Sequence, residues 1–455
     1  MAKPKAGIIP GVGDIQAMWE ASGLKAKLLF TVLMLAVFRL GAQVPVWGVH
    51  PERLQALLSN QMLGFLDMFS GGALTSVSVL ALGIGPYITA SIIMQLLTVV
   101  IPRLEEMQKE EGEAGRRKIS QYTRYMAVVL ALFQSGLIIR LVASAGAVDP
   151  NVTPWVFYAE SILTLTAGAT FALWVAEMIT ERGIGNGGSL LILAGILSRI
   201  PIYWTRTVDL VAGNAEKSFF LVILLIIYLV TIGLIIVLQE ATRKIFIVSA
   251  KRQVGNRIYG GQNTHIPFKI NPSGVMPIIF AFAVLAFPST IFALVEQQQT
   301  NINHALEHQA VLKDALAQII TFYRLYLSPG KAGYIILEFL LIVFFTFFYS
   351  SIVPSMQPRE IADNLKKYGS AIPGIKPGRP TAEKLEEILS RTTFIGAFAL
   401  AIITLVASSA TSITGITTLA GLGATSLIIM VGVALDTVNQ IRVNLLARQY
   451  QGFLK

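Results

Sequence analysis

The stretch Val77–Ile101 reads VSVLALGIGPYITASIIMQLLTVVI and holds no charged side chain. A helix needs about 20 mostly apolar residues to cross about 30 Å of hydrocarbon. The apolar character is continuous and does not alternate with polar residues, which excludes a membrane β-strand. The stretch therefore predicts a helix that crosses a membrane, and the same pattern recurs along the chain.

Ten stretches of this kind occur in the 455-residue chain. The other nine are Leu28–Val46, Met126–Ala145, Trp155–Ile179, Leu190–Tyr203, Phe219–Leu238, Val275–Val295, Ile335–Val353, Phe394–Ala410 and Ala424–Val438. Their number and length exclude a large soluble protein with buried core helices. We predict an all-α polytopic membrane protein with ten transmembrane helices.

The composition agrees with this class of protein. Apolar residues make up 54% of the chain and charged residues 14%, whereas soluble domains average about 25% charged residues. The chain has no cysteine, which excludes disulfides, thiolate metal sites and a cysteine nucleophile. The first 27 residues contain Pro4, Pro10 and four lysines but no apolar core, so we do not expect a cleaved signal peptide.

The positive charges indicate how the helices are oriented. The chain has 36 Lys and Arg against 26 Asp and Glu, a net charge of +10. If the N-terminus is cytoplasmic, 27 of the 36 basic residues fall in cytoplasmic segments and six in outer segments. Such an excess marks the cytoplasmic side of a membrane protein. We therefore expect both termini in the cytoplasm, and nucleic-acid binding is not needed to explain the charge.

Ten spans divide into two halves of five, which must then be inverted relative to each other in the membrane. Gly83-Ile-Gly-Pro86-Tyr-Ile88 and Gly274-Val-Met-Pro277-Ile-Ile279 repeat one pattern in the second span of each half. Gly and Pro inside a span predict a broken or kinked helix, which either borders a cavity or packs closely on its neighbours. The predicted division is a cytoplasmic segment 1–27, halves 28–217 and 218–438, and a cytoplasmic tail 439–455.

Residues 62–75 read MLGFLDMFSGGALT and are apolar but too short to cross a membrane. A short helix that swings on Gly71 and Gly72 would suit a movable stopper. Three arginines, Arg39, Arg140 and Arg199, lie toward the outer ends of spans, where we expect them to snorkel to the interface. The spans hold no series of acids and histidines for a proton relay.

Two short motifs resemble chemical sites. Gly183-Ile-Gly-Asn-Gly-Gly188 matches a dinucleotide-binding pattern, but it joins two spans and lacks the preceding strand, so we predict a tight turn between helices. His304-Ala-Leu-Glu-His308 fits a zinc-protease pattern, and we favour a solvated helix face. No phosphate-binding loop occurs. We predict no metal, no cofactor and no nucleotide hydrolysis by the chain itself.

Two cytoplasmic loops, 239–272 and 354–393, are longer than a connection requires. The β-branched run Ile245–Val248, followed by Gly260-Gly261, predicts a hairpin that projects from the membrane. A basic protrusion of this kind suits a large partner, including ribosomal RNA.

Five segments together resemble the SecY family, the channel subunits of the bacterial protein translocase. They are Met68–Val100, Glu111–Tyr125, Ile179–Ser189, Ala250–Pro267 and Pro358–Gly378, and the resemblance extends over nearly the whole chain. It implies an hourglass pore between two inverted five-helix halves, which opens sideways between spans 2–3 and 7–8. It also implies passage of unfolded secretory polypeptides and lateral release of apolar segments into lipid, in the bacterial inner membrane.

The resemblance implies four groups of functional residues. The pore ring is Ile84, Ile88, Ile192, Ile279 and Ile429. The plug, within 62–75, includes Phe65, Asp67, Met68, Phe69, Ser70, Gly71 and Gly72. The lateral gate includes Thr89, Ser91, Gln95, Gly274 and Pro277. The docking residues for a motor or ribosome are Arg252, Arg257, Arg359, Lys366, Lys367 and Lys376.

The partners implied by the resemblance are small SecE-type and SecG-type membrane subunits, the SecA ATPase, the ribosome, secretory and membrane protein substrates, and anionic lipids. Lys376 stands where the family usually has Arg, and it keeps the charge but loses the bidentate fork. Asn256 stands where a second Arg is common. A solute transporter or an intramembrane enzyme would require buried charges or catalytic pairs within the spans, which we do not find.

Overall fold

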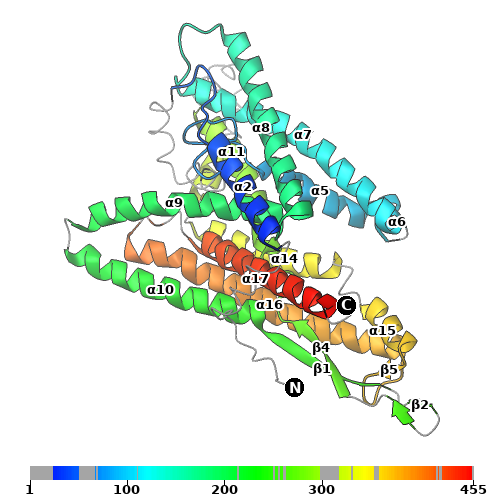
Figure 1. Cartoon of the computed structure of the whole chain (residues 1–455). Coiled ribbons are helices and arrows are strands. Elements are labelled where there is room, and N and C mark those ends of the chain that lie inside the picture. Colours follow the sequence, from blue (N-terminus) through cyan, green and yellow to red (C-terminus); the bar gives the residue numbers. More distant parts are fainter. Residues whose placement is uncertain are drawn as a thin grey trace. The chain divides into compact units, whose positions relative to one another are not determined.

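The computed structural model describes residues 24–50, 67, 70–109, 111–212, 215–249, 252–254, 257–259, 263–297, 317–328, 331–352, 358–416, 419 and 423–452. Each of the ten predicted spans contains a helix (Figure 1). Within the described ranges, seven helices are long and apolar enough to cross a membrane, or eight if one bent pair counts as a span. The predicted class, a polytopic α-helical membrane protein, is confirmed.

The chain forms two compact units. The first comprises Met1–Ile202, Pro288–Asp314 and Val433–Lys455, and the second comprises Tyr203–Phe287 and Ala315–Gly432. The predicted boundary after residue 217 stays a prediction. Three helices contribute residues to both units: α9 (Gly187–Ala212), α11 (Met276–Gln297) and α17 (Ala424–Gly452).

The first unit is built on a packed set of helices: α2 (Leu24–Gly41), α5 (Gly85–Val100), α6 (Pro102–Lys109), α7 (Gly112–Ser144) and α8 (Pro154–Arg182). Helix α7 packs against both α5 and α8, and α2 packs against α8. Pro102 cannot continue α5, and α6 turns away from it by 105°. The unit is therefore held together around α7 and α8.

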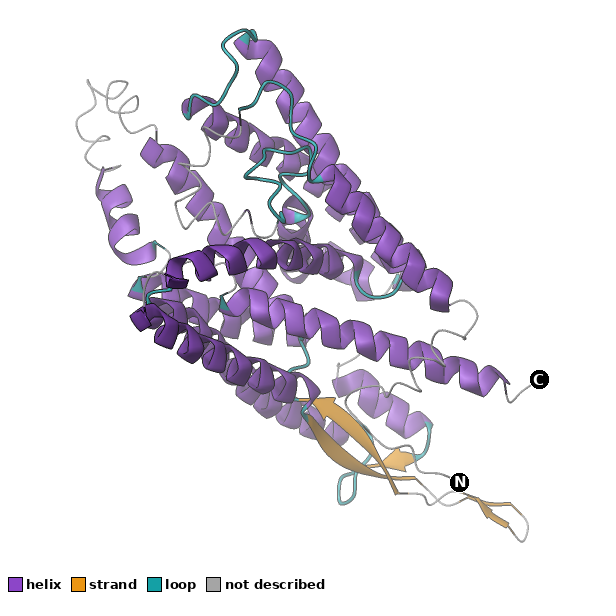
Figure 2. Cartoon of the chain, turned by 60° about the vertical axis from the view of Figure 1, so that its left-hand side comes forward, coloured by secondary structure: helices purple, strands orange, loops and turns teal. Residues whose placement is uncertain are grey.

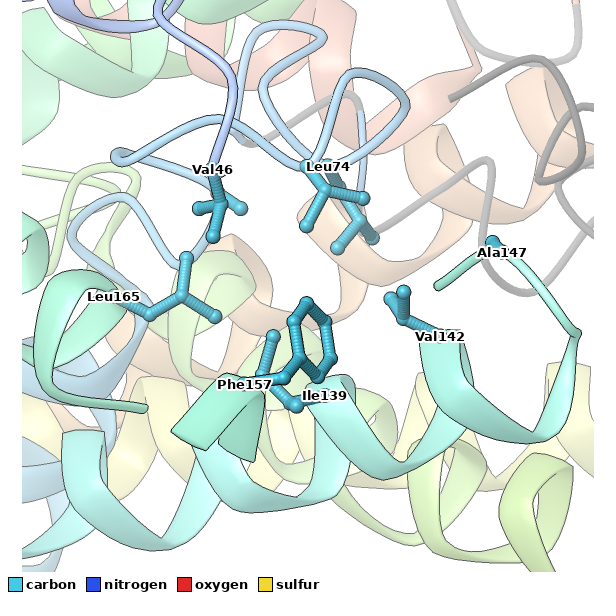
Figure 3. Close-up of a cluster of buried hydrophobic side chains, with 9 residues drawn as sticks. Val46, Leu74, Ile139, Val142, Ala147, Phe157 and Leu165 are labelled. Atoms are coloured by element: carbon cyan, nitrogen blue, oxygen red, sulfur yellow. The ribbon is translucent and has the colours of Figure 1, made fainter. Parts of the chain in front are cut away.

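An apolar cluster joins the loops of this unit to α7 and α8 (Figure 3). It consists of Val46, Leu74, Val77, Ala81, Ile139, Val142, Ala147, Phe157 and Leu165. The chain after α2 also pairs with the later loop, since Val46 donates its N–H to the Val77 carbonyl and Val79 donates to the Val44 carbonyl. These contacts hold residues 73–81 in a defined path although they form no helix.

The predicted span Val77–Ile101 is therefore wrong in its first eight residues. Residues 77–84 form turns with an isolated β-bridge at Ser78, and the helix α5 begins only at Gly85. Val77 has a φ of +41° and Gly83 a φ of +52°, and left-handed backbone angles do not continue a right-handed helix. Hydropathy alone could not distinguish a buried apolar turn from a helix.

The second unit contains α10 (Ala215–Glu240), α14 (Ala332–Ile352), α16 (Arg379–Thr414) and the π-helix η1 (Tyr323–Leu327). Helix α16 packs against both α10 and α14. Aromatic rings fill part of the α14–α16 interface, where Phe339 and Phe394 both contact Phe398. Ring–ring packing of this kind adds to the stability that area burial provides.

A small β-sheet extends from the end of α10 (Figure 2). Its strands are β1 (Thr242–Ser249), β4 (Asn263–Lys269) and β5 (Ser370–Ala371), in the order β4-β1-β5, and β1 pairs with β4 in antiparallel register from Thr242↔Lys269 to Val248↔Asn263. Strands β2 (Arg252–Val254) and β3 (Arg257–Tyr259) form a second, two-stranded ladder. The predicted hairpin is confirmed.

Candidate functional site

The repeated Gly-x-x-Pro pattern marks a helix start in each unit. Gly83 has a φ of +52° and Gly274 a φ of +62°, and only glycine adopts such angles at little cost. Pro86 and Pro277 follow as the second residues of α5 and α11. Backbone N–H groups in the first turn of a helix have no acceptor within the helix, so a proline, which lacks an N–H, fits there without losing a hydrogen bond. The pattern therefore begins a helix after a turn and does not kink the middle of a span, which corrects the expectation from the sequence.

The ring isoleucines of the first unit lie at the start of α5 and in the first turns of α9. Ile84 is the residue before α5, is buried, and accepts the N–H of Ile88 at 3.1 Å. A Cβ atom on Gly188, at the start of α9, would lie 3.3 Å from the Cδ1 atom of Ile84. Ile192 lies one turn further along α9 and is also buried. Two helix starts with buried isoleucines thus meet in this unit.

The second unit repeats this arrangement with α11 and α17. Ile279 lies in the first turn of α11, and Ile429 lies in α17, where both side chains are buried. Gly432 of α17 lies so close to Val275 that a larger residue at position 432 would overlap the Val275 side chain. The ring role of the five isoleucines stays a prediction.

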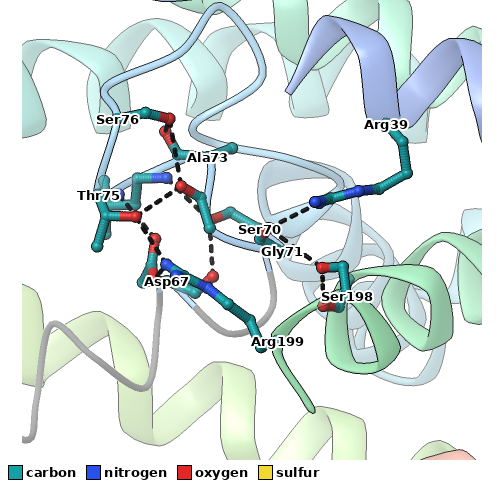
Figure 4. Close-up of polar contacts among 12 residues, drawn as sticks. Arg39, Asp67, Ser70, Gly71, Ala73, Thr75, Ser76, Ser198 and Arg199 are labelled. Atoms are coloured by element: carbon teal, nitrogen blue, oxygen red, sulfur yellow. Dashed lines mark hydrogen bonds and ion pairs between the residues drawn. The ribbon is translucent and has the colours of Figure 1, made fainter. Parts of the chain in front are cut away.

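Of the predicted plug residues, Asp67, Ser70, Gly71 and Gly72 are described, whereas Phe65, Met68 and Phe69 lie outside the described residues. The described part is a turn closed by its own hydrogen bonds (Figure 4). Thr75 donates its N–H to Asp67 Oδ1 at 2.7 Å, and Gly72 donates to the Asp67 carbonyl at 2.8 Å. The carboxylate of Asp67 forms a buried ion pair with Arg199 of α9.

Sequence reasoning missed the role of the two arginines near this turn. We expected Arg199 to snorkel, but its side chain is only 12% exposed and pairs with Asp67. The expectation was wrong for this residue because Asp67, 132 positions earlier in the chain, becomes its neighbour only in the folded unit. Arg39 of α2 donates Nη1–H to the Gly71 carbonyl at 2.7 Å.

Three of the predicted gate residues, Thr89, Ser91 and Gln95, lie along α5, and the other two, Gly274 and Pro277, lie at the start of α11. Thr89 Oγ1 donates to the Gly85 carbonyl at 3.2 Å, and Gln95 Nε2 donates to Ser91 Oγ at 3.3 Å. Gln95 Oε1 is buried without a hydrogen-bond partner in the described structure. In the second unit, Asn271 Nδ2 donates to the Gly274 carbonyl at 2.8 Å, and Pro277 follows as the second residue of α11. Their role in a gate stays a prediction.

The two long loops form one body, which we call the sheet lobe: β1, β4, β5, α15 (Pro358–Lys367) and the first turns of α16 (Figure 1). Strand β1 pairs with β5 through Val248↔Ala371 and Ser249↔Ser370. The lobe has an apolar core of Ile245, Phe268, Ala362, Ile372, Ala382, Leu385 and Leu389. Sequence reasoning treated the loops separately and missed this union.

The sheet lobe carries four of the predicted docking residues on its surface. Arg359, Lys366 and Lys367 are exposed on α15, and Lys376 is exposed in the segment between β5 and α16. Arg252 lies in β2 and Arg257 in β3, opposite Tyr259 and Val254. Exposed basic residues attract an acidic or phosphate-bearing surface.

The turn Gly183–Gly188 joins α8 and α9, as predicted. Side chains from three helices accept its backbone N–H groups: Ile184 donates to Thr31, Gly185 to Gln440 and Gly187 to Thr180. It is a structural junction of the first unit. The His304–His308 motif lies outside the described residues.

The family model of SecY matches residues 78–438. The chain belongs to the SecY family. It is 42% identical over 442 residues to the protein translocase subunit SecY of a Synechocystis species, with 96% of each chain covered. It is 42% identical over 452 residues to the SecY of Streptomyces coelicolor, which covers 96% of this chain and 98% of that protein.

Solved structures agree with the SecY fold. One, described as a protein conducting channel, superposes with a TM-score of 0.64 and 16% identity, covering 92% of each chain. Another, from work on the plug domain of SecY, superposes with a TM-score of 0.63 and 16% sequence identity, and again covers 92% of each chain. A sequence identity this low supports only the fold, whereas the relatives that are 42% identical establish the family. The predicted function, a channel subunit of a protein translocase, is confirmed at this level.

Proposed function

We propose that this SecY-family chain passes unfolded secretory polypeptides through a pore ringed by its five isoleucines and releases apolar segments sideways into lipid. The observation that most directly supports this function is found in both units. Each unit brings together two helix segments that bear a buried isoleucine at a predicted ring position. In the first unit these are the starts of α5 and α9, and in the second unit α11 and α17. The relatives named as translocase subunits support this reading.

An isoleucine ring suits a pore that must open for a chain and close to ions. Apolar constrictions block ions because water withdraws from them. Isoleucine is stiff at χ1, so the ring keeps its shape at rest and yields only when a polypeptide pushes through. In this proposal the segment 62–75 acts as a movable plug, and the ring and the plug together maintain the seal.

The lateral gate would open between spans 2 and 3 on one side and spans 7 and 8 on the other. In the structure these spans contain α5 and α7, and α11 and α14. Gln95 brings to α5 a buried amide oxygen without a partner in the part of the chain that the structure describes. A buried polar group of this kind is costly until it is paired. A passing signal segment with a donor group would gain that hydrogen bond, which makes Gln95 a candidate contact.

The sheet lobe would receive the machine that drives the polypeptide, either a SecA-type motor or a ribosome. Two structurally similar channels are described in ribosome complexes, Sec61 from the canine endoplasmic reticulum with a TM-score of 0.58 and yeast Ssh1 with 0.56. The exposed basic residues of α15 support an anionic partner. We propose that the chain assembles with SecE-type and SecG-type subunits and contacts anionic lipids. We also propose that it lies in the bacterial inner membrane with both termini in the cytoplasm.

The test is reconstitution of the chain with a SecE-type subunit, SecA, ATP and a secretory precursor in proteoliposomes. We expect the precursor to become protected from added protease, and no protection with a competent SecE partner present would overturn the proposal. For the ring, we expect Ile429→Asn to raise the resting ion leak roughly tenfold, because an amide wets an apolar constriction.

The matched control for the ring is Ile428→Asn. Ile428 and Ile429 are both fully buried in α17, but consecutive residues of a helix point about 100° apart. A leak from Ile429→Asn alone supports the ring, whereas equal leaks from both variants would indicate general loss of packing.

A further inference from the structure

Two arginines from different helices hold the turn that Asp67 forms with residues 70–76 (Figure 4). Arg199 of α9 pairs with the carboxylate of Asp67 and donates Nη2–H to Thr75 Oγ1 at 2.6 Å. The side chains of Asp67 and Arg199 are 4% and 12% exposed, respectively. Both ends of the turn are thus bound to one guanidinium that is withdrawn from solvent.

The middle of the turn is bound separately. Its Gly71 carbonyl accepts Arg39 Nη1–H at 2.7 Å and Ser198 Oγ–H at 3.3 Å. Arg39 belongs to α2, and Ser198 belongs to α9 next to Arg199. Two helices of the first unit therefore hold the turn through hydrogen bonds, and those from the arginines are charge-assisted and about twice as strong as neutral ones.

Hydrogen bonds within the turn link these holding points. Asp67 Oδ1 accepts the Thr75 N–H at 2.7 Å, Ser70 Oγ donates to the Asp67 carbonyl at 3.0 Å and accepts the Leu74 N–H at 3.1 Å. Leu74 itself lies in the apolar cluster on α7 and α8. If the turn is pulled away from Asp67, the hydrogen bonds of Asp67 and Ser70 must therefore break before the turn can leave its position.

We propose that Asp67, Arg199 and Arg39 form a latch that sets how readily the turn leaves its resting position. They are positioning residues for the seal, and the inference rests on the proposed role of 62–75 as the plug. An apolar polypeptide can replace apolar contacts of the plug, but it cannot replace an ion pair. Opening must therefore separate Asp67 from Arg199, and separating a buried pair leaves uncompensated charges.

The absence of cysteine allows a direct reporter of the latch. Ala73 lies in the turn and is fully buried, so Ala73→Cys places the only thiol of the chain inside it. Ser78 lies just beyond the turn, is also fully buried, and its hydroxyl makes no hydrogen bond in the described structure. Ser78→Cys is therefore a second reporter, for loosening of the unit beyond the turn.

The latch variants are Asp67→Asn and Arg199→Gln, each combined with each reporter and labelled with a maleimide in proteoliposomes without substrate. Asn keeps an oxygen for the Thr75 N–H and removes only the charge. We expect labelling at position 73 to rise about a hundredfold, because removing one partner of a buried ion pair is strongly destabilising. Labelling at position 78 should stay unchanged. When Asp67→Asn and Arg199→Gln are combined, the increase in labelling at position 73 should be smaller than the product of the two single increases.

The control is Arg206→Gln, which removes an exposed arginine further along α9. Unchanged labelling at position 73 in both latch variants, or an equal rise at positions 73 and 78, would overturn the latch. The labelling needs no translocation, so it is independent of the proposed function. A rise at position 73 without any ion leak would support the latch and contradict the role of the segment as a plug.

Discussion

At the scale of single residues, Gly72 shows why the turn needs a glycine pair. A Cβ atom at position 72 would lie 2.8 Å from the guanidinium carbon of Arg199, and Gly72 has a φ of +94°. A Cβ atom at position 71 would lie 2.8 Å from Gly195 Cα and 2.9 Å from Arg39 Nη1. The glycines allow both arginines to approach the backbone. The hinge role expected for them stays a prediction.

We predict that Gly72→Ala destabilises the first unit by about 2–3 kcal/mol, because the new methyl group is strained at this φ and displaces Arg199. Thermal unfolding in detergent measures the effect. Gly146→Ala is the matched control, since Gly146 has a φ of +66° and a methyl group there would have no atom within 4 Å among the described residues. A loss of stability no larger than that of Gly146→Ala would show that the approach of Arg199 is unimportant.

At the scale of elements, the sheet lobe depends on contacts between segments more than 90 residues apart in the chain. Ile245 of β1 and Leu385 of α16 share one apolar core with Ala362 of α15. A two-stranded hairpin alone is marginally stable in water. Burial of one hairpin face against α15 and α16 therefore stabilises the sheet lobe.

We predict that Leu385→Ala destabilises the lobe by about 2–5 kcal/mol, because it leaves a cavity in the core. Hydrogen exchange of β1 and β4 should accelerate, and motor-driven translocation should fall while the resting ion leak stays unchanged. Leu405→Ala is the control on the same helix, since Leu405 is 38% exposed. Unchanged exchange in β1 and β4, or an equal acceleration in the control, would contradict a lobe held together by this core.

At the scale of the whole molecule, the excess of basic residues in alternate loops and at the termini predicts the orientation in the membrane. The lobe and the loop between α7 and α8 should then face opposite sides. Tyr368 in the lobe is 82% exposed, and Asn151 in that loop is also exposed. Both positions can carry a single reporter thiol in this cysteine-free chain.

We predict that Asn151→Cys reacts with a membrane-impermeant maleimide in intact cells, whereas Tyr368→Cys reacts only after the membrane is permeabilised. The physical reason is that basic loops are retained on the cytoplasmic side. Labelling of the unaltered chain, which has no thiol, provides the background. The reverse pattern would overturn the predicted orientation.

Much of the fold can be predicted from hydropathy, since every predicted span contains a helix. The ends are less accurate. Helix α7 begins at Gly112, whereas the predicted span begins at Met126, because polar residues continue a helix after it leaves the membrane. Hydropathy places the start of α5 eight residues early, because apolar residues in a buried turn look like a span. Among the site residues, the ring and gate positions depend on family resemblance, and physics alone would assign them to the core.

The sequence by itself determined the membrane class, the number of apolar spans, the family and the hairpin, because these depend on composition and short-range pattern. Only the tertiary structure decided that Asp67 meets Arg199, that Arg39 reaches Gly71, and that two distant loops form one lobe. Each of these contacts joins residues far apart in the chain. Their pairing depends on how helices and strands pack, and no local pattern of residues encodes it.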